Sequence, residues 1–182
     1  MGRTNFSRQA ALNFLDDWGY VYTVPHGYLG DLGEQFGFDQ EAVIYLDPYA
    51  HQGDGKTVMK IREAVKLYPD SYASLFYPRN YSIRQLQIGR QDIFLKYSSD
   101  HPWKSNVGNV QIEKVSAAPR MGSYNEYFPM FAIDYIPFTE FELLAVDLNT
   151  APLIKFTPVE DIMSPKEIVN EIRGWMEWKY GN

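Results

Sequence analysis

The sequence predicts an α+β protein in which antiparallel strands form the sheets and helices flank them. Three observations lead to this class. The 182 residues are 45% hydrophobic and 22% charged, which is typical of a folded chain of one domain, or one domain with a small lobe. Fourteen tyrosines and eleven phenylalanines favour strands, because aromatic side chains fit a pleated, half-buried surface. Helix signals are clearest near the two ends of the chain.

The segment 1–71 mixes helix and strand signals. Ala11, Phe14, Leu15 and Trp18 recur at helical spacing, and Gly19 follows them as a helix stop. The elements expected in order are a helix over 8–18, a strand over 20–24, a loop through Gly27, Gly30, Gly33 and Gly37, a strand over 42–46, a polar loop to residue 55, and a helix around Val58, Ile61 and Val65.

The segment 72–182 is richer in strands. Strands are expected over 72–76, 83–88, 92–97, 110–115, 130–136 and 143–149, the last two as a hairpin. The polar stretches 98–109 and 119–125 are expected to be loops. A C-terminal helix follows, because Ser164, Pro165 and Glu167 combine a cap, a first-position proline and a reciprocal carboxylate.

Charge and cysteine content exclude several classes of protein. The formal net charge of −6 disfavours non-specific binding to nucleic acid or to an anionic membrane. The absence of cysteine excludes disulfides and cysteine-ligated zinc. No stretch approaches the roughly 20 apolar residues that span a bilayer, and the N-terminus lacks the apolar core of a signal peptide. We therefore expect a cytoplasmic protein with neither nucleic acid nor membrane as a partner.

The hairpin carries a polar cluster. Alternation in the strand over 143–149 places Asp147 and Asn149 on one face. The apolar side chains are expected on the other face: Leu144, Val146 and Leu148. If Ile136 pairs with Leu143, Asp134 lies one rung from both polar side chains.

Carboxylates that meet across a ladder repel each other unless a cation lies between them. Magnesium prefers one or two carboxylates together with water and phosphate oxygens, and an asparagine oxygen adds a neutral ligand. We therefore assign Asp134, Asp147 and Asn149 as candidate magnesium ligands. The alternative is that they face water or cap turns.

The stretch 131–152, with Asp134 on its first strand and Asp147 and Asn149 on its second, resembles the metal-binding hairpin of the ATP-grasp superfamily, in its RimK-like and glutathione-synthetase-like branch. The preceding motifs occur in a similar order. Arg84 opens a strand that ends in an Ile-Gly turn, and a basic, serine, asparagine motif follows an aromatic residue. That motif is Lys104, Ser105 and Asn106 after Trp103. The likeness covers residues 83 to the end.

The resemblance implies two small lobes with antiparallel sheets and flanking helices, within a single compact domain over 1–182. Residues 1–71 would form a degenerate nucleotide-binding lobe, and residues 72–182 the metal-binding and catalytic lobe. The adenine of ATP would lie between the lobes. The residues that it assigns to cofactor binding are Gly53, Gly55, Lys56 and Lys96, and those that it assigns to catalysis are Arg84, Lys104 and Asn106.

Three positions depart from the family pattern. Asp47 stands before Pro48, where the family usually carries a phosphate-binding lysine. Lys104 replaces an arginine, which keeps the charge but loses bidentate geometry. Asp147 stands where glutamate is usual. We also expect no separate substrate domain upstream of the lobes, so substrate recognition is expected to come from elsewhere.

The implied function is a magnesium- and ATP-dependent carboxylate–amine ligase that acts through an acyl phosphate. Its partners would be nucleotide and a small-molecule or peptide carboxylate. The alternative is a binding or interaction protein that has lost nucleotide turnover, as a homo-oligomer or with a larger partner. Arg84 and Lys104 could instead belong to a solvated strand edge and loop.

Two other signals are weaker. Gly55, Lys56 and Thr57 resemble the end of a P-loop, but Ala50 stands where its first glycine is required. The three histidines lie in predicted loops without a partner at metal-ligand spacing, and we expect them to be exposed: His26, His51 and His101.

Overall fold

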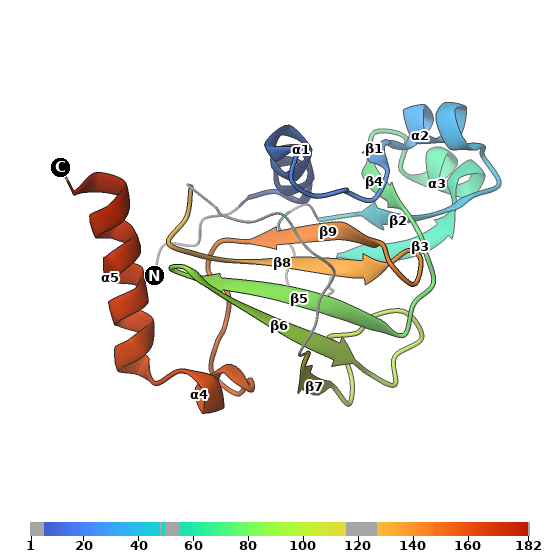
Figure 1. Cartoon of the computed structure of the whole chain (residues 1–182). Coiled ribbons are helices and arrows are strands. Elements are labelled where there is room, and N and C mark those ends of the chain that lie inside the picture. Colours follow the sequence, from blue (N-terminus) through green and yellow to red (C-terminus); the bar gives the residue numbers. More distant parts are fainter. Residues whose placement is uncertain (1–5, 48, 50–54, 116–126, 182) are drawn as a thin grey trace.

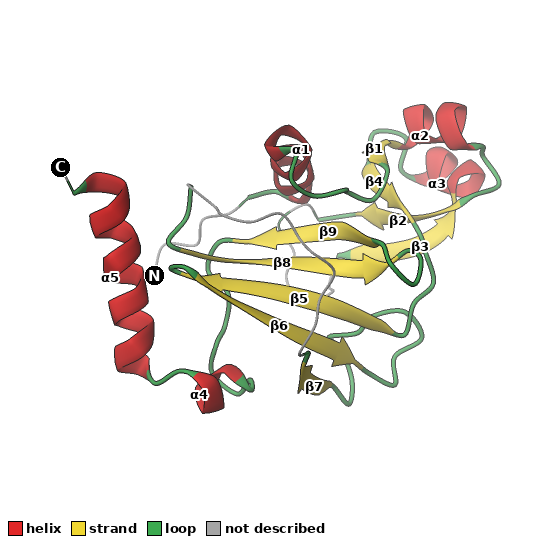
Figure 2. Cartoon of the chain, viewed as in Figure 1, coloured by secondary structure: helices red, strands yellow, loops and turns green. Residues whose placement is uncertain are grey.

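A computed structural model of the chain describes residues 6–47, 49, 55–115 and 127–181. These residues form two antiparallel sheets with flanking helices, which confirms the predicted α+β class (Figures 1 and 2). The first sheet has the strand order β1 (His26–Tyr28), β4 (Tyr72–Leu75), β2 (Glu41–Tyr45) and β3 (Lys56–Lys60). The second has the order β7 (Gln111–Lys114), β6 (Gln91–Ser98), β5 (Tyr81–Ile88), β8 (Met130–Pro137) and β9 (Leu143–Asn149).

Helices flank both sheets in Figure 1. They are α1 (Arg8–Trp18), α2 (Leu29–Phe36), α3 (Ile61–Leu67), α4 (Val159–Ile162) and α5 (Pro165–Tyr180). Helices α2 and α3 lie beside the first sheet, and α5 stands at one end of the second sheet. None of the helices in the described ranges has the length and apolarity needed to cross a membrane.

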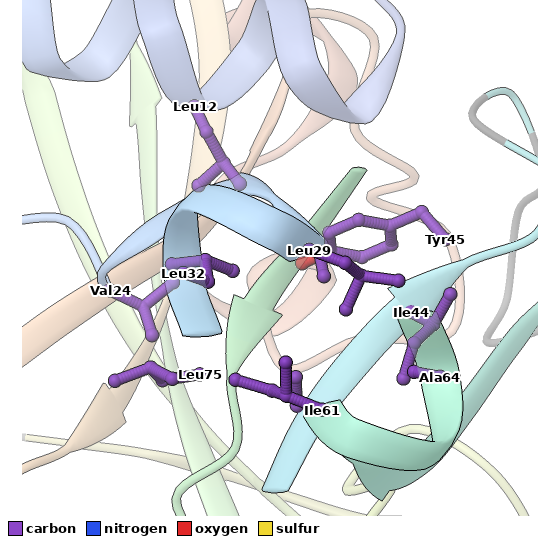
Figure 3. Close-up of a cluster of buried hydrophobic side chains, with 11 residues drawn as sticks. Leu12, Val24, Leu29, Leu32, Ile44, Tyr45, Ile61, Ala64 and Leu75 are labelled. Carbon is purple, nitrogen blue, oxygen red and sulfur yellow. The ribbon is translucent and has the colours of Figure 1, made fainter. Parts of the chain in front are cut away.

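Helix α1 packs on both sheets. Its start is fixed by Ser7, whose Oγ accepts a hydrogen bond from the Ala10 backbone N–H at 3.1 Å. Leu12 enters the core of the first sheet, which Figure 3 shows. Ala11 and Leu15 enter the core on one face of the second sheet. One helix therefore joins the two halves of the molecule through hydrophobic burial.

The opposite face of the second sheet is covered from the C-terminal side. Leu86, Leu95 and Ala132 are buried there against Val159 of α4 and against Met163. Ile168 and Ile172 of α5 pack on the same cluster. The predicted cap of α5 is confirmed, because both hydrogen bonds of the capping box between Ser164 and Glu167 are present.

Several predicted elements are wrong. The glycine-rich loop contains β1 and α2, because Leu29 and Leu32 are buried, and their burial outweighs the roughly 1 kcal/mol that each helical glycine costs. Val58 lies in β3 rather than in a helix. Residues 20–24 form no named strand, although the 22–24 backbone hydrogen-bonds to Ala145 of β9.

The two sheets divide at a different place from the predicted lobes. Strand β4 pairs with β1 and β2, so it belongs to the first sheet although the predicted division at 71/72 assigned it to the second lobe. The division between the sheets falls between Leu75 and Tyr81. The connection is held to the β8–β9 hairpin, because Arg79 donates hydrogen bonds to the backbone oxygens of Pro137 and Phe138 at 2.5 and 2.9 Å.

The His26 side chain is only 6% exposed, contrary to the prediction that this histidine is exposed. Its Nε2 lies 2.8 Å from Asp16 Oδ2, and its Nδ1 lies 2.5 Å from Tyr72 Oη. The Tyr72 hydroxyl donates to Asn13 Oδ1 at 3.0 Å. Because Asp16 and Asn13 belong to α1, this polar network attaches the helix to β1 and β4 of the first sheet.

Gly89 provides a test of the packing between α5 and the second sheet. Its φ is +57°, and a Cβ atom there would lie 2.5 Å from the backbone oxygen of Glu171 in α5. We expect Gly89→Ala to lower the free energy of unfolding by about 1 to 3 kcal/mol, measured with urea. Gly174→Ala is the matched control in α5, where a Cβ atom meets nothing within 4 Å and should stabilise the helix by about 1 kcal/mol. Equal stability of Gly89→Ala and the wild type would contradict the packing.

Candidate functional site

A cleft lies between the two sheets. It has a volume of about 140 Å³. The first sheet and the connection after it contribute Val43, Tyr45, Lys56, Ser74, Leu75, Phe76 and Tyr77. The second sheet and its loop contribute Ser82, Arg84, Tyr97, Trp103, Lys104, Ser105, Asn106, Asp134, Ile136, Val146 and Asp147. The cleft therefore brings together six of the predicted site residues: Lys56, Arg84, Lys104, Asn106, Asp134 and Asp147.

The β8–β9 hairpin places two carboxylates face to face. Asp134 pairs directly with Asp147, whereas the next residue along β8, Tyr135, pairs with Ala145. Val146 is thus an extra residue on β9, a β-bulge, and Ile136 pairs with Leu144 rather than with Leu143 as predicted.

The bulge also corrects the predicted faces of β9. Val146 and Asp147 both line the cleft, although simple alternation would place neighbouring residues on opposite faces. Leu148 belongs to the core on the far side of the sheet, while Leu144 and Val146 pack against the core of the first sheet. The prediction that Leu144, Val146 and Leu148 share one face is therefore wrong.

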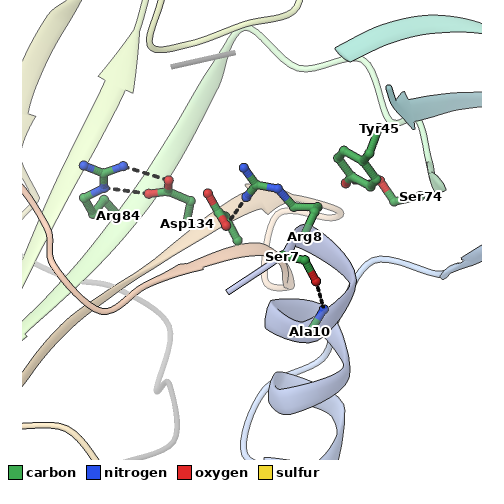
Figure 4. A network of polar contacts seen from close by, with 8 residues as sticks. Ser7, Arg8, Ala10, Tyr45, Ser74, Arg84 and Asp134 are labelled. Atoms are coloured by element: carbon green, nitrogen blue, oxygen red, sulfur yellow. Dashed lines mark hydrogen bonds and ion pairs between the residues drawn. The ribbon is translucent and has the colours of Figure 1, made fainter. Parts of the chain in front are cut away.

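Asp134 is bound by an arginine from the neighbouring strand. Arg84 pairs with it across β5 and β8, and donates from Nε and Nη2 to its two carboxylate oxygens at 2.6 and 2.8 Å (Figure 4). Burial alone would raise the pKa of Asp134, but the charges of Arg84, Arg8 and Lys56 hold it below its ordinary value. The Arg84 guanidinium also lies 4.9 Å from the centre of the Tyr97 ring.

Asp147 is bound by an arginine that the sequence analysis missed. Arg8, the first residue of α1, forms an ion pair with it, and the two side chains are 11% and 28% exposed. Figure 4 shows the Arg8 side chain between the hairpin and Tyr45. A sequence signal was available, because Arg8 precedes Ala11, Leu12 and Leu15 at spacings of three, four and seven. A basic residue in line with the buried stripe of a helix indicates an internal ion pair.

Lys56 supplies a cation from the first sheet. It pairs with Tyr45 across β2 and β3, and its Nζ lies 5.8 Å from the centre of the Tyr45 ring. Burial, and then the charge of Arg8, lowers the pKa of Lys56 to about 7, while Asp134 opposes the shift. Asp47, which the sequence analysis placed where a phosphate-binding lysine is usual, is exposed and accepts a hydrogen bond from the Tyr49 backbone N–H at 2.9 Å.

The polar loop after β6 is folded over the cleft by local hydrogen bonds. His101 Nδ1 accepts from the backbone N–H groups of Trp103 and Lys104 at 3.3 and 3.1 Å. Ser105 Oγ lies 2.6 Å from Ser82 Oγ, which ties the loop to β5. The predicted basic, serine, asparagine motif therefore reaches the cleft as a folded unit, and His101 organises it.

Three predicted residues with described positions lie away from the cleft lining. Asn149 pairs with Ala132 across the hairpin, and its Oδ1 accepts from the Ala151 backbone N–H at 2.9 Å. Lys96 lies on the opposite face of the second sheet, 3.7 Å from Glu113. Gly55 forms a turn with φ +61°, and its oxygen accepts from the backbone N–H of Leu46. Gly53 lies outside the described residues.

The electrostatics of the site favour an anion. Four basic side chains surround two carboxylates: Arg8, Lys56, Arg84 and Lys104 against Asp134 and Asp147. The two carboxylates fit magnesium as an oxygen donor pair on adjacent strands. Among the described residues, no group of three or more histidine, cysteine, aspartate or glutamate side chains could hold a metal ion alone. A metal would therefore need further oxygens, which the phosphates of a nucleotide provide.

No family model matches the sequence, and no curated protein matches it. By fold, the chain is similar to the ATP-grasp ligases, which confirms the predicted resemblance at the level of structure.

The particular solved structures share little sequence with the chain. That of ATP-grasp ligase PsnB with a phosphomimetic variant of minimal precursor, Mg and ADP has a TM-score of 0.63 at 10% identity, over 94% of this chain and 59% of that one. The structure of D-alanine–D-alanine ligase from Bacillus anthracis has a TM-score of 0.58 at 8% identity, and the match covers 92% of this chain and 66% of that one. The structure of D-cycloserine synthetase DcsG has a TM-score of 0.59 at 8% identity, and the match covers 96% of this chain and 70% of that one. The chain thus spans 59 to 70% of the length of these ligases.

The Arg84–Asp134 pair should be required for stability. Arg84→Met leaves Asp134 without its bidentate partner, and an unpaired buried carboxylate costs about 3 to 5 kcal/mol. We expect a loss of that size in the free energy of unfolding at pH 7, measured with urea. Arg84→Met combined with Asp134→Leu should recover most of it, because no buried charge is then left unpaired. A double variant as unstable as the single one would contradict this account.

Proposed function

We propose that the chain binds magnesium ATP in the cleft and acts as an ATP-dependent carboxylate–amine ligase. The observation that carries the proposal is the convergence of Lys56, Arg84 and Lys104 on the pair Asp134 and Asp147, in a cleft between two lobes. The fold of the ATP-grasp ligases supports the same reading.

The cleft lining offers the two kinds of surface that a nucleotide needs. Val43, Leu75 and Ile136 offer apolar surface for a base. Lys56 and Lys104 offer charge for the phosphates, and come from opposite lobes. The cleft volume of 140 Å³ is below the roughly 300 to 1,000 Å³ of typical ligand pockets. We therefore expect the lobes to separate when a nucleotide enters.

Asp134 and Asp147 would hold magnesium, with phosphate oxygens and water completing its shell. When bound, the metal supplies positive charge that neutralises the phosphates and orients the γ-phosphoryl group. Asn149, the third predicted ligand, does not line the cleft and its Oδ1 accepts from the Ala151 backbone N–H, so the proposed site uses the two carboxylates without it.

Arg84 and Lys104 would stabilise the charge on the γ-phosphoryl group during its transfer, and Asn106 would help to orient it. A substrate carboxylate oxygen attacks the γ-phosphorus and ADP leaves, which gives an acyl phosphate. An amine then attacks the acyl carbon and inorganic phosphate leaves, which gives an amide and releases a proton. The acid would be a small molecule or a peptide. Solved structures of PsnB and MdnC contain precursor peptides, which supports the peptide class.

A second function is a nucleotide-binding or interaction protein without turnover, alone, as a homo-oligomer or with a larger partner. A specific observation favours it. Both carboxylates are engaged by arginines, and the third candidate ligand, Asn149, is engaged by backbone. Formation of ADP from ATP with carboxylate and amine substrates would separate the ligase from the binding protein. Both readings keep the predicted cytoplasmic setting.

Calorimetry with ATP, in magnesium and in EDTA, tests the assigned site. We expect the wild type to bind magnesium ATP at least about tenfold more tightly than metal-free ATP, as expected for one charge-assisted contact of about 1.5 to 3 kcal/mol. Asp147→Asn should remove this magnesium dependence. Asn149→Ala should retain most of it, because Asn149 does not line the cleft. No heat with the wild type at millimolar ATP would refute the proposed function.

The pKa of Lys56 predicts a dependence of ATP affinity on pH. Phosphate favours the protonated amine, so above pH 7 binding must take up a proton and affinity should fall by up to about tenfold per pH unit. The measurement is calorimetry with magnesium ATP from pH 7.5 to 9, where phosphate groups of pKa about 6 are already ionised. Lys56→Arg stays charged throughout and should show no such fall. Identical slopes for the two proteins would contradict the role of Lys56.

A further inference from the structure

Arg8 is an unusual residue for the position that it occupies. It lies at the start of the buried stripe of α1, and its side chain is 11% exposed. Its charge acts in both lobes, since it forms an ion pair with Asp147 and its guanidinium carbon lies 5.8 Å from the centre of the Tyr45 ring. Arg8 is absent from the cleft lining and approaches Asp147 from α1. It is therefore placed to act on the carboxylate rather than on a ligand directly.

The ion pairs occupy the oxygens that a metal would need. Arg84 binds both oxygens of Asp134 at 2.6 and 2.8 Å, and Arg8 binds Oδ1 of Asp147. A divalent cation that approaches alone meets the two guanidinium groups that already contact these carboxylates. Like charges a few ångströms apart repel each other much more strongly in a partly buried site than in bulk water, because the effective dielectric constant is lower there.

We propose that Arg8 is a positioning residue that holds Asp147 in an ion pair and keeps bare divalent cations off the carboxylate pair. A metal then enters with a polyphosphate, whose negative charge offsets the basic side chains. Metal and nucleotide consequently bind with positive cooperativity. This inference rests on the proposed metal role of Asp134 and Asp147, and it assigns that site a requirement for nucleotide.

Manganese provides a probe that needs neither nucleotide nor turnover. The free ion is titrated by electron paramagnetic resonance with the wild type and with Arg8→Gln. We expect Arg8→Gln to bind manganese at least about tenfold more tightly than the wild type, because removal of a neighbouring positive charge lowers the repulsion. A merely structural role for Arg8 predicts no gain or a loss.

Two matched variants complete the test. Arg62→Gln removes an arginine that is 52% exposed and pairs with Asp39, and it should leave manganese affinity unchanged. Arg8→Gln combined with Asp147→Asn should abolish the gain, since the released carboxylate is then missing. Arg8→Lys keeps the charge but loses the guanidinium fork, so its affinity should lie between those of the wild type and Arg8→Gln.

The outcomes separate this inference from the proposed function. The inference is overturned if Arg8→Gln binds manganese no more tightly than the wild type. If Arg8→Gln does not fold, the same comparison is made with Arg8→Lys, and an affinity no higher than that of the wild type overturns the inference. If the wild type does not bind magnesium ATP, the proposed function is overturned. The manganese affinities of the wild type and Arg8→Gln can still be compared, because that measurement uses no nucleotide. A wild type that binds magnesium ATP, together with an Arg8→Gln variant that gains nothing, retains the function and discards the role of Arg8.

Discussion

Two carboxylates that face each other across neighbouring strands place a constraint on the whole molecule. Asp134 and Asp147 are direct partners in the β8–β9 ladder, where opposed side chains are separated by about 5 Å and like charges destabilise. Their charges must be balanced locally. Arg84 provides one counter-ion within the sheet, and Arg8 provides the other from α1. The hairpin, β5 and α1 are therefore joined by charge as well as by packing.

This constraint gives α1 its place at the junction. The helix buries Leu12 with the first sheet and Ala11 and Leu15 with the second, and directs Arg8 towards the cleft. The Asp16–His26 contact ties its other end to the first sheet. Separation of the lobes for a nucleotide must therefore either carry α1 with one lobe or break one of these attachments. The Arg8–Asp147 ion pair crosses from α1 to the hairpin, so it reports on that movement.

Local signals in the sequence predict much of the fold, and none of the register. Helices α1 and α5 are well predicted, because their capping residues and the spacing of their apolar residues are local features of the sequence. The hairpin is predicted as well, but the bulge at Val146 is not, since a single extra residue leaves the alternating pattern almost unchanged. The extra residue places Asp147, rather than Val146, opposite Asp134. Helix α2 was missed for the opposite reason, because its glycines resemble a loop while its stability comes from the burial of Leu29 and Leu32.

The candidate site likewise contains residues that local motifs predict and residues that only the tertiary structure brings together. Arg84, Lys104 and Asn106 reach the cleft as their motifs predict, while Lys96 points to the other face because alternation along β6 opposes it to Tyr97. Asp47 looked like an acid in place of a phosphate-binding lysine, but it lies in an exposed turn, and Lys56 brings the positive charge from the adjacent strand. Contacts between lobes, such as Arg8 with Asp147, depend on tertiary structure and leave only a faint trace in the sequence.

Whether the chain is a ligase or a binding protein depends on whether the Arg8–Asp147 and Arg84–Asp134 ion pairs open when a nucleotide binds. Under either proposal the cleft would attract phosphate, because Lys56 and Lys104 approach from opposite lobes. Transfer of a phosphoryl group requires more, since magnesium must take oxygens that Arg8 and Arg84 now hold. If phosphate draws the guanidinium groups away, the displaced charges become available to the reacting γ-phosphoryl group. If the ion pairs persist, the same residues form a permanent structural link between α1 and the sheet, and the proposed nucleotide would be bound without being consumed.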